Sequence, residues 1–493
     1  MKLRELLCVD NIDSVYSETE ISSISRSEHA CTDSLLFCIV GNSFDKASFI
    51  SLANSGGAKL VVSDIDLDGC EVPIVRVDNA RRSYAFAIAA LCGNPQKEMT
   101  VYGITGTNGK TSTSYFLHSI LNFSGVKNAL IGTNGVIYNK EKIPFPPEGS
   151  GISQMTTPDP EFLYPLLKHL LSIGIKTVVM EVSSHALALS KVDPIRFKAS
   201  IFTNFSHEHL DFHGTISQYL EAKLKLAELS EKNLYNVNDT AFASSFKNRH
   251  AVTYGIEKGT YSACSIKNNG VDGVTYFLKH RDSVFRVESQ MCGNFTVVNS
   301  LAALSLALDE GLSSEVLCDA VASVTRIPGR LERLQIDKTH YPFTVLIDYA
   351  HTPKALEELL AGEPFKLRKA RLITLFGCGG DRDKEKRALM GAIAEKYSDK
   401  VYITNDNPRG EEPAKIISDI LAGIKRSSKA VVIPDRKEAI TKAFTELRRD
   451  DILLLVGKGN ENYLVDKEGK RYFSERDIVY ALADVKERKN NEH

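Results

Sequence analysis

The segment from residue 99 to residue 123 constrains the fold of this chain more than any other. It begins with apolar residues typical of a strand, continues through the turn Gly106-Thr-Asn-Gly109 and ends in a helical pattern. Glycines between a strand and a helix let backbone N–H groups approach a phosphate, and the helix N-terminus adds favourable partial charge. Lys110 can then reach the β- and γ-phosphates, and the Thr111 hydroxyl can ligate magnesium. The segment therefore predicts a nucleotide-binding α/β domain; a tight turn without a ligand is the weaker alternative.

The C-terminal third of the chain favours the same fold class, because apolar runs alternate with helical patterns through it. The expected strands lie at 344–348, 370–376, 400–404, 430–433 and 451–456, and the expected helices at 353–360, 384–396, 413–424 and 436–447. Such alternation is typical of βαβ units in a mostly parallel sheet, whose ligands bind in the loops after the strands.

The length of the chain and two turns predict its domains. A chain of 493 residues is long enough for about three domains. Turn signals stand at 92–95 and 327–329. We therefore predict an α/β protein with three domains: a small N-terminal α/β domain (1–97), a central domain of phosphate-loop type with a mostly parallel sheet (98–331), and a Rossmann-like C-terminal domain (332–493).

The composition excludes several classes of protein. The formal net charge of −1 lacks the basic excess typical of nucleic-acid-binding proteins, so we expect no nucleic-acid partner. The nine cysteines form no Cys-x-x-Cys pair, which favours reduced thiols over a disulfide scaffold. No apolar stretch is long enough for a membrane span, and residues 1–10 do not have the pattern of a signal peptide. We therefore expect a cytoplasmic enzyme.

The phosphate loop and the motifs after it resemble those of the Mur ligases, ATP-dependent enzymes that form amide bonds in peptidoglycan precursor synthesis. The general pattern GxxxxGK[ST] would place glycine where this chain has Ile104, whereas Gly106-Thr-Asn-Gly-Lys-Thr111 has the form found in these ligases. The further matches follow in order: Thr156-Thr-Pro158, Met180-Glu-Val-Ser-Ser-His185, Thr203-Asn-Phe-Ser-His-Glu-His-Leu-Asp-Phe-His-Gly214, Ala222-Lys223, Asn299, Gly329-Arg330, Asp348-Tyr-Ala-His351, Gly377-Cys-Gly-Gly-Asp-Arg-Asp383, Asp406-Asn-Pro-Arg409 and Gly457-Lys-Gly459. The series is most similar to the members that add the third peptide residue.

The resemblance implies a reaction, its cofactors and the residues that carry it. ATP would phosphorylate a substrate carboxylate to an acyl phosphate, which an amine then attacks, so the protein mainly positions groups and stabilises charge. ATP and Mg²⁺ are the implied cofactors. The implied catalytic residues are Lys110, Glu181, His209 and Lys223, and the implied metal ligands are Thr111, Glu181, His209 and Lys223 as a carbamate. The implied ATP contacts are Gly106, Thr107, Asn108, Gly109, Lys110, Thr111, Ser112, Asn299, Arg330 and Asp348.

The three histidines His207, His209 and His213 offer an alternative reading as a zinc site. The neighbouring phosphate loop favours magnesium instead, because hard cations prefer oxygen and phosphate ligands. We expect His185 to be a core or supporting histidine.

The resemblance also implies two substrates. UDP-N-acetylmuramoyl-L-alanyl-D-glutamate would contact Ser25, Asn42, Thr156, Thr157, Ser183 and Lys191, with its uridine held by the N-terminal domain. The amino acid would bind in the C-terminal domain, at Arg382, Asp406, Asn407, Pro408, Arg409, Gly457 and Glu461. The central domain would hold ATP and Mg²⁺.

The resemblance implies that the added amino acid is meso-2,6-diaminopimelate, and Arg409 is the residue that implies it. Members that use meso-2,6-diaminopimelate carry Asp-Asn-Pro-Arg here, whereas lysine-adding members typically lack the arginine. Diaminopimelate differs from lysine by one carboxylate, which a planar guanidinium can grip through two hydrogen bonds. The alternatives are a lysine-adding ligase, a folylpolyglutamate synthase-like ligase, and a nucleotide-dependent regulatory protein without chemistry.

Overall fold

The structure is a computed structural model, and it describes residues 1–7, 14–26, 33–41, 44–139, 141–143, 155–247 and 249–483. It has α/β architecture and divides into two compact units. Unit 1 comprises Met1–Ser262 and Leu301–Leu317, and unit 2 comprises Ala263–Ser300 and the chain from Cys318 onward. The chain passes between the units within β13 (Tyr261–Asn268), α11 (Asn294–Asp309) and α12 (Ser314–Ala322). The predicted α/β class is confirmed, while the domain boundaries at 97/98 and 331/332 stay a prediction.

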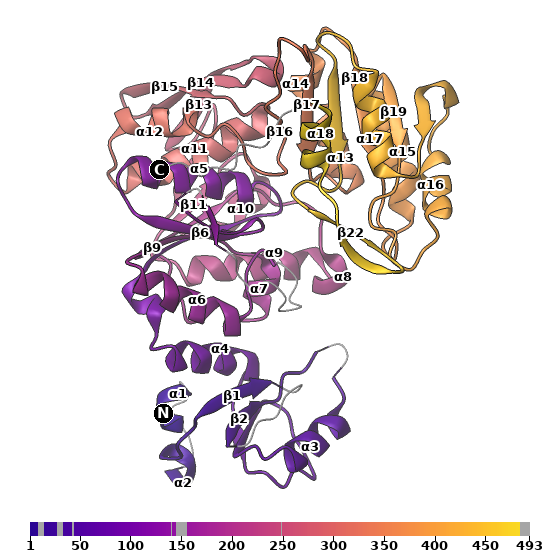
Figure 1. Cartoon of the computed structure of the whole chain (residues 1–493). Coiled ribbons are helices and arrows are strands. Elements are labelled where there is room, and N and C mark those ends of the chain that lie inside the picture. Colours follow the sequence, from indigo (N-terminus) through magenta and orange to yellow (C-terminus); the bar gives the residue numbers. More distant parts are fainter. Residues whose placement is uncertain are drawn as a thin grey trace. The chain divides into compact units, whose positions relative to one another are not determined.

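Unit 1 begins with a small parallel sheet in the order β1-β2-β3-β4 (Figure 1). Its strands are β1 (Ser23–Arg26), β2 (Ser34–Phe37), β3 (Leu60–Ser63) and β4 (Ile74–Arg76), and its helices are α1 (Leu3–Leu6), α2 (Ser14–Ser17), α3 (Lys46–Ser55), α4 (Ala80–Leu91) and the 3₁₀ turn η1 (Pro95–Glu98). The side chain of Asn79 caps α4 by accepting the N–H of Arg82, which fixes where the helix begins.

The larger sheet of unit 1 has the strand order β12-β11-β10-β5-β9-β6-β7-β8. The strands are β5 (Thr100–Thr105), β6 (Asn128–Gly132), β7 (Gly135–Tyr138), β8 (Glu141–Ile143), β9 (Thr177–Glu181), β10 (Ala199–Phe202), β11 (Asn233–Asn236) and β12 (Val252–Ile256). From β12 to β6 neighbouring strands are parallel, and the ladder β6-β7-β8 is antiparallel. The helices are α5 (Lys110–Phe123), α6 (Pro160–Ser172), α7 (Ser184–Ala188), α8 (Leu210–His213), α9 (Ile216–Glu228) and α10 (Thr240–Ser245). The predicted helix over 110–123 is confirmed.

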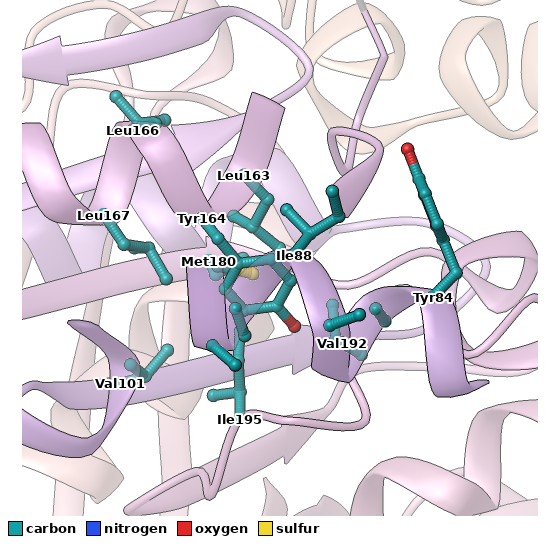
Figure 2. Packing of buried hydrophobic residues seen from close by; sticks show 14 of the residues in the cluster. Tyr84, Ile88, Val101, Leu163, Tyr164, Leu166, Leu167, Met180, Val192 and Ile195 are labelled. Carbon is teal, nitrogen blue, oxygen red and sulfur yellow. The ribbon is translucent and has the colours of Figure 1, made fainter. Parts of the chain in front are cut away.

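One hydrophobic core joins α4 to the larger sheet of unit 1. Figure 2 shows Ile88 of α4 beside Leu163 and Tyr164 of α6, with Met180 of β9 behind them. Each of these side chains is less than a tenth exposed. Burying a large apolar side chain contributes about 1.5–3 kcal/mol, so this contact fixes α4 on the larger sheet.

Unit 2 contains a second, mostly parallel sheet in the order β16-β17-β21-β18-β19-β20. Its strands are β16 (Glu332–Arg333), β17 (Thr344–Asp348), β18 (Leu372–Phe376), β19 (Lys400–Ile403), β20 (Ala430–Val432) and β21 (Ile452–Val456). Its helices are α13 (Pro353–Leu360), α14 (Glu363–Lys366), α15 (Glu385–Tyr397), α16 (Pro413–Leu421), α17 (Arg436–Thr445) and α18 (Glu475–Leu482), with the 3₁₀ turns η2 (Gly270–Asp272) and η3 (Ser427–Lys429). The predicted alternation of strands and helices is confirmed.

Two antiparallel hairpins complete unit 2 and were not expected from the sequence. They are formed by β14 (Val274–His280) with β15 (Ser283–Ser289), and by β22 (Tyr463–Asp466) with β23 (Gly469–Tyr472). Within the described parts of the chain, no helix combines the length and apolar character needed to cross a membrane.

Candidate active site

The loops that follow β10, β5, β9 and β6 meet at one edge of the larger sheet in unit 1. These four strands are adjacent and parallel, so their carboxyl ends lie side by side. The loop after β5 is the phosphate loop, and the strand β9 ends at Glu181. Residues distant in the sequence are thereby brought together at the place where α/β sheets bind ligands.

The conformation of the phosphate loop depends on Gly106. This residue has a φ of 148°, and a side chain here would overlap the hydroxyl of Thr203. Two residues that follow β10 hold the loop. The Asn204 side chain accepts a hydrogen bond from the Asn108 N–H at 2.9 Å, and the Thr203 hydroxyl donates one to the Asn108 carbonyl at 2.6 Å. These contacts fix the loop before a nucleotide binds.

Two lysine ammonium groups lie against the carbonyl oxygens of the phosphate loop. Lys110 Nζ donates to the carbonyls of Gly106 and Thr107, both at 2.8 Å, and Lys223 Nζ donates to that of Gly106 at 2.9 Å. Lys223 is only 1% exposed. Burial holds the pKa of Lys223 well below its usual value, and the nearby Lys110 lowers it further. Burial therefore favours the neutral, nucleophilic form of the Lys223 amine.

The carboxylate of Glu181 is fully buried and held by hydroxyl and backbone donors. Oε2 accepts hydrogen bonds from the hydroxyls of Thr111 at 3.0 Å and Thr133 at 2.9 Å, and Oε1 accepts the Thr133 N–H at 3.1 Å. A side chain at Gly132 would overlap this carboxylate. The threonines thus set the orientation of Glu181 beside the phosphate loop.

His209 belongs to the same cluster. Burial lowers the pKa of His209 most; the nearby Glu208 opposes this shift, and Lys110 adds to it. The ring of His185 lies 4.9 Å from that of His209, and burial together with its histidine neighbours lowers the pKa of His185 to about 4. These shifts favour the neutral form of both imidazoles, which is the form that can ligate a metal.

The chemistry of this cluster fits a hard cation better than zinc. Hydroxyl, carboxylate and imidazole groups of Thr111, Glu181 and His209 stand beside a loop suited to phosphate oxygens, which Mg²⁺ prefers as ligands. Among the residues that the structure describes, no group of three or more His, Cys, Asp or Glu side chains could hold a metal ion.

Three of the residues expected to contact the sugar peptide lie next to Glu181. The Thr156 hydroxyl is 3.1 Å from that of Thr133. The Thr157 hydroxyl donates to the Glu181 carbonyl at 2.9 Å and accepts the Ser183 N–H at 3.0 Å. These contacts place the expected sugar-peptide residues and the phosphate loop at the same sheet edge.

Of the other residues expected to bind the sugar peptide, the structure describes Lys191 and Ser25. Lys191 forms an ion pair with Asp159 at 2.5 Å. Ser25 lies on β1, and its buried hydroxyl has no hydrogen-bond partner in the described part of the chain. Asn42 lies outside the described residues.

Unit 2 holds the remaining residues expected to contact ATP. Asn299 is buried on α11. Asp348 ends β17, and its two carboxylate oxygens accept the N–H groups of Leu331 and Ala350, both at 2.8 Å. Burial raises the pKa of Asp348, while the nearby Arg330 opposes this shift. Asp348 and Arg330 are thus brought together within unit 2.

The expected amino-acid residues converge at the carboxyl ends of β21, β18 and β19, which are adjacent in unit 2. The Asn407 side chain donates to Glu461 Oε2 at 3.0 Å and accepts the Val465 N–H at 3.0 Å. The carbonyl of Pro408 packs so closely on Gly380 that a side chain at position 380 would overlap it. A side chain at Gly457 would reach the Asp406 carboxylate.

The guanidinium of Arg409 is positioned by backbone groups. Arg409 has a φ of 51°, and its Nη1 donates to the Gly380 carbonyl at 2.8 Å. Its N–H donates to the Val465 carbonyl at 3.0 Å. Arg382 is exposed on the preceding loop. The residues Arg382, Asp406, Asn407, Pro408, Arg409, Gly457 and Glu461 therefore lie in three neighbouring loops.

A buried arginine ties two of these loops together. Arg387 on α15 is 0% exposed and forms two hydrogen bonds with Glu411, at 2.8 and 3.0 Å. Glu411 also accepts the Asp381 N–H at 2.6 Å. The hydrogen bonds with Arg387 lower the pKa of Glu411 to about 2. Arg387 thus joins the loop of Arg382 to the loop of Arg409.

Cys378 lies in the glycine-rich loop after β18. Its side chain is 3% exposed, and its sulfur is 3.8 Å from that of Met390. Burial raises the pKa of this thiol to about 12. The thiol therefore contributes packing to the loop.

Thr133, Arg387 and Lys458 lie near these sites and were given no role from the sequence, although Lys458 stands within the motif Gly457-Lys-Gly459. Thr133 stands in Gly132-Thr-Asn-Gly135, which repeats the tetrapeptide of the phosphate loop, so this repetition is a signal that could have identified it. Lys458 stands between two glycines, a context in which lysine is usually solvated, yet it is 0% exposed.

The comparisons with family models, curated proteins and solved structures all match the chain to Mur ligases. Residues 104–307 match the Mur ligase middle domain, and residues 329–459 match the domain described as Mur ligase, glutamate ligase domain. UDP-N-acetylmuramoyl-L-alanyl-D-glutamate–2,6-diaminopimelate ligase 1 of Clostridium acetobutylicum is 38% identical over 482 residues, covering 96% of each chain. The ligase of that name from Aquifex aeolicus is 40% identical over 451 residues, covering 90% of each. A solved structure of such a ligase matches with a TM-score of 0.70 and 27% identity, covering 98% of this chain and 99% of the other.

Proposed function

The chain belongs to the Mur ligase family, and from this premise we infer that it is an ATP-dependent, ADP-forming ligase that adds meso-2,6-diaminopimelate to the D-glutamate of UDP-N-acetylmuramoyl-L-alanyl-D-glutamate. This reaction belongs to peptidoglycan precursor synthesis. Relatives with this printed activity match at 33–40% identity over nearly the whole chain, which supports the inference.

The phosphate loop binds the triphosphate of ATP in this proposal. Its backbone N–H groups and Lys110 hold the phosphates, and the remaining loop residues Gly106, Thr107, Asn108, Gly109, Thr111 and Ser112 shape the cradle. In unit 2, Asp348 accepts a ribose hydroxyl, Arg330 meets a phosphate and Asn299 lies near adenine. Within unit 1, the phosphate loop presents the γ-phosphoryl group to the D-glutamate carboxylate, so that an acyl phosphate can form and the incoming amine can attack it.

Mg²⁺ is held by Thr111, Glu181 and His209 in this proposal. When bound, it would neutralise charge on the phosphate oxygens. Thr111 and Thr133 hold the Glu181 carboxylate at the edge of the phosphate loop, which supports this assignment.

Lys223 becomes carbamylated in this proposal. The deprotonated amine attacks CO₂, a C–N bond forms and one proton leaves, so that a neutral amine becomes an anionic carbamate. Burial and the depressed pKa of this amine support the step. The carbamate adds a negative charge to the magnesium site.

The sugar peptide is bound by Thr156, Thr157, Ser183 and Lys191, with Ser25 on β1 and with Asn42, which lies outside the described residues. The proximity of Thr157 and Ser183 to Glu181 supports this placement. The amino acid binds at the loops of Arg382, Asp406–Arg409, Gly457 and Glu461. Arg409 receives the second carboxylate of diaminopimelate, and Glu461 receives the ammonium beside it. A cytoplasmic location is supported by the seven described cysteines, all of which are free thiols.

The substrate assignment rests on the position of the Arg409 guanidinium. It donates a hydrogen bond to the Gly380 carbonyl, which holds it between the loops that follow β18 and β19. The test measures phosphate release from ATP with the UDP-linked dipeptide and each candidate amino acid. We expect release with diaminopimelate and at least tenfold lower kcat/KM with lysine. Equal use of lysine would overturn the choice of amino acid, and release with folate and glutamate would overturn the whole proposal.

A further inference from the structure

Lys458 is a fully buried lysine at the centre of the amino-acid loops. It follows β21 in the turn Gly457-Lys-Gly459, and its side chain is 0% exposed. The rings of Tyr463 and Phe473 lie 5.7 and 5.9 Å from its nitrogen and cover it. A buried ammonium is costly unless its charge is compensated, so the partners of Lys458 decide what it does.

The partners described for the Lys458 ammonium lie in the amino-acid loops and at the start of β22. It donates to the Asn407 side-chain oxygen at 3.1 Å and to the Tyr463 carbonyl at 2.7 Å. The carboxylates of Asp406 and Glu461 lie 3.4 and 3.6 Å away. Lys458 therefore sits between the two carboxylates that line this site.

These contacts determine how Asn407 is oriented. Because Lys458 and the Val465 N–H both donate to its side-chain oxygen, its NH₂ group must face Glu461, to which it donates at 3.0 Å. The Glu461 carboxylate is thereby held in one orientation. Without the ammonium, the Asn407 side chain loses one of the two donors that define this orientation.

Lys458 also sets the charge of the site. Among the charged residues of the site that are at least partly buried, Asp406 and Glu461 carry two negative charges and Lys458 and Arg409 carry two positive charges, so these four groups balance; Arg382 is exposed. The far end of diaminopimelate bears an ammonium and a carboxylate and is neutral overall, whereas the far end of lysine bears an ammonium alone. A balanced site suits the neutral end, and a site with excess negative charge suits the cationic end.

We propose that Lys458 is a positioning residue that orients Asn407 and Glu461 and balances the charge of this site, so that the enzyme selects a zwitterionic diamino acid over lysine. The proposal rests on the proposed function and adds a second determinant to the bidentate contact of Arg409. Arg409 attracts the extra carboxylate, and Lys458 removes the excess negative charge that would favour a simple cation.

The test uses the full-length chain and steady-state kinetics with diaminopimelate, lysine and ATP. We expect Lys458→Met to raise the KM for diaminopimelate at least tenfold and to lower the ratio of kcat/KM for diaminopimelate to that for lysine at least tenfold. The KM for ATP should stay within twofold of that of the parent. Lys338→Met is the matched control, since Lys338 donates to Phe343 and Thr344 at the opposite end of β17.

A variant that removes a negative charge instead of a positive one distinguishes a change in amino-acid preference from a simple loss of structure. Asp406→Asn leaves one positive charge in excess, so the same kcat/KM ratio should rise at least threefold. The double variant Lys458→Met with Asp406→Asn restores the balance and should return the ratio toward that of the parent. If Lys458→Met does not fold, Asp406→Asn still tests the charge argument.

Three results would be informative. An unchanged ratio in Lys458→Met, or a fall of the ratio in Asp406→Asn, overturns the role of Lys458 while leaving the ligase activity of the parent in place. A parent chain that releases phosphate with neither diamino acid overturns the proposed function instead.

Discussion

Replacing Thr133 by valine tests how the Glu181 carboxylate is held. Valine keeps the shape of threonine but removes the hydroxyl that donates to Glu181 Oε2 at 2.9 Å, while the Thr133 N–H and the Thr111 hydroxyl continue to donate. One of the three hydrogen bonds described for this buried carboxylate is therefore lost. The variant should fold, because valine has nearly the shape of threonine and the two remaining donors still satisfy the buried carboxylate.

The expected magnitude follows from the kind of hydrogen bond that is lost. A hydrogen bond to a charged group contributes about 1.5–3 kcal/mol, and about 1.4 kcal/mol corresponds to a factor of ten. Groups that orient a metal-binding carboxylate change metal affinity by about 10–100-fold when they are removed. We therefore expect the Mg²⁺ concentration for half-maximal activity to rise by about 10–100-fold.

The measurement has two parts. Activity is titrated with Mg²⁺, and binding of Mn²⁺ in the presence of a non-hydrolysable ATP analogue is followed by electron paramagnetic resonance, which does not depend on turnover. Thr133→Ser keeps the hydroxyl and should restore both values to within about threefold of the parent. Unchanged Mn²⁺ affinity in a folded Thr133→Val variant would refute the assignment of Thr133 to this role.

Three further changes test other parts of the molecule. Arg409→Ala should raise the KM for diaminopimelate by about 10–100-fold, since charge-assisted hydrogen bonds are lost, and should leave the KM for ATP unchanged in the same assay. Gly132→Ala should displace the Glu181 carboxylate that an added methyl group would overlap, so nucleotide-dependent Mn²⁺ binding should be lost although circular dichroism shows a folded chain. The free energy of unfolding of the parent should fall as the pH is lowered from 4.5 toward 2. The pKa of Glu411 is about 2 in the folded chain and 4.5 ordinarily, so the unfolded chain takes up the proton first. Arg387→Met should make the free energy of unfolding, measured with urea, depend less on pH across the same range. An unchanged pH dependence would contradict the role of the Arg387–Glu411 pair.

Local patterns in the sequence were sufficient to predict the phosphate loop and the strands and helices around it. The helix over 110–123 begins and ends where the pattern predicts, because glycine conformation and helical periodicity are properties of neighbouring residues. The alternation of strands and helices in the C-terminal third was predicted from the sequence equally well. The roles of the site residues stay predictions, although many of those residues lie close together.

Sheet order was not contained in any local pattern. Thr133 and Glu181 are 48 residues apart and meet only because β6 lies beside β9. Likewise, Lys458 becomes buried because the hairpin β22–β23 and the segment after it bring Tyr463 and Phe473 over the side chain. Neither hairpin pairing nor strand order follows from the turn residues alone.

Cys378 has a consequence for covalent inhibition of this enzyme. A cysteine in the glycine-rich loop of the amino-acid site is an obvious target for an electrophile. Burial raises the pKa of this thiol to about 12, however, so the protonated form predominates at neutral pH. Alkylating agents and mild oxidants should therefore react with this residue very slowly, and compounds directed at this loop must gain their affinity from the charged groups of Arg409 and Glu461.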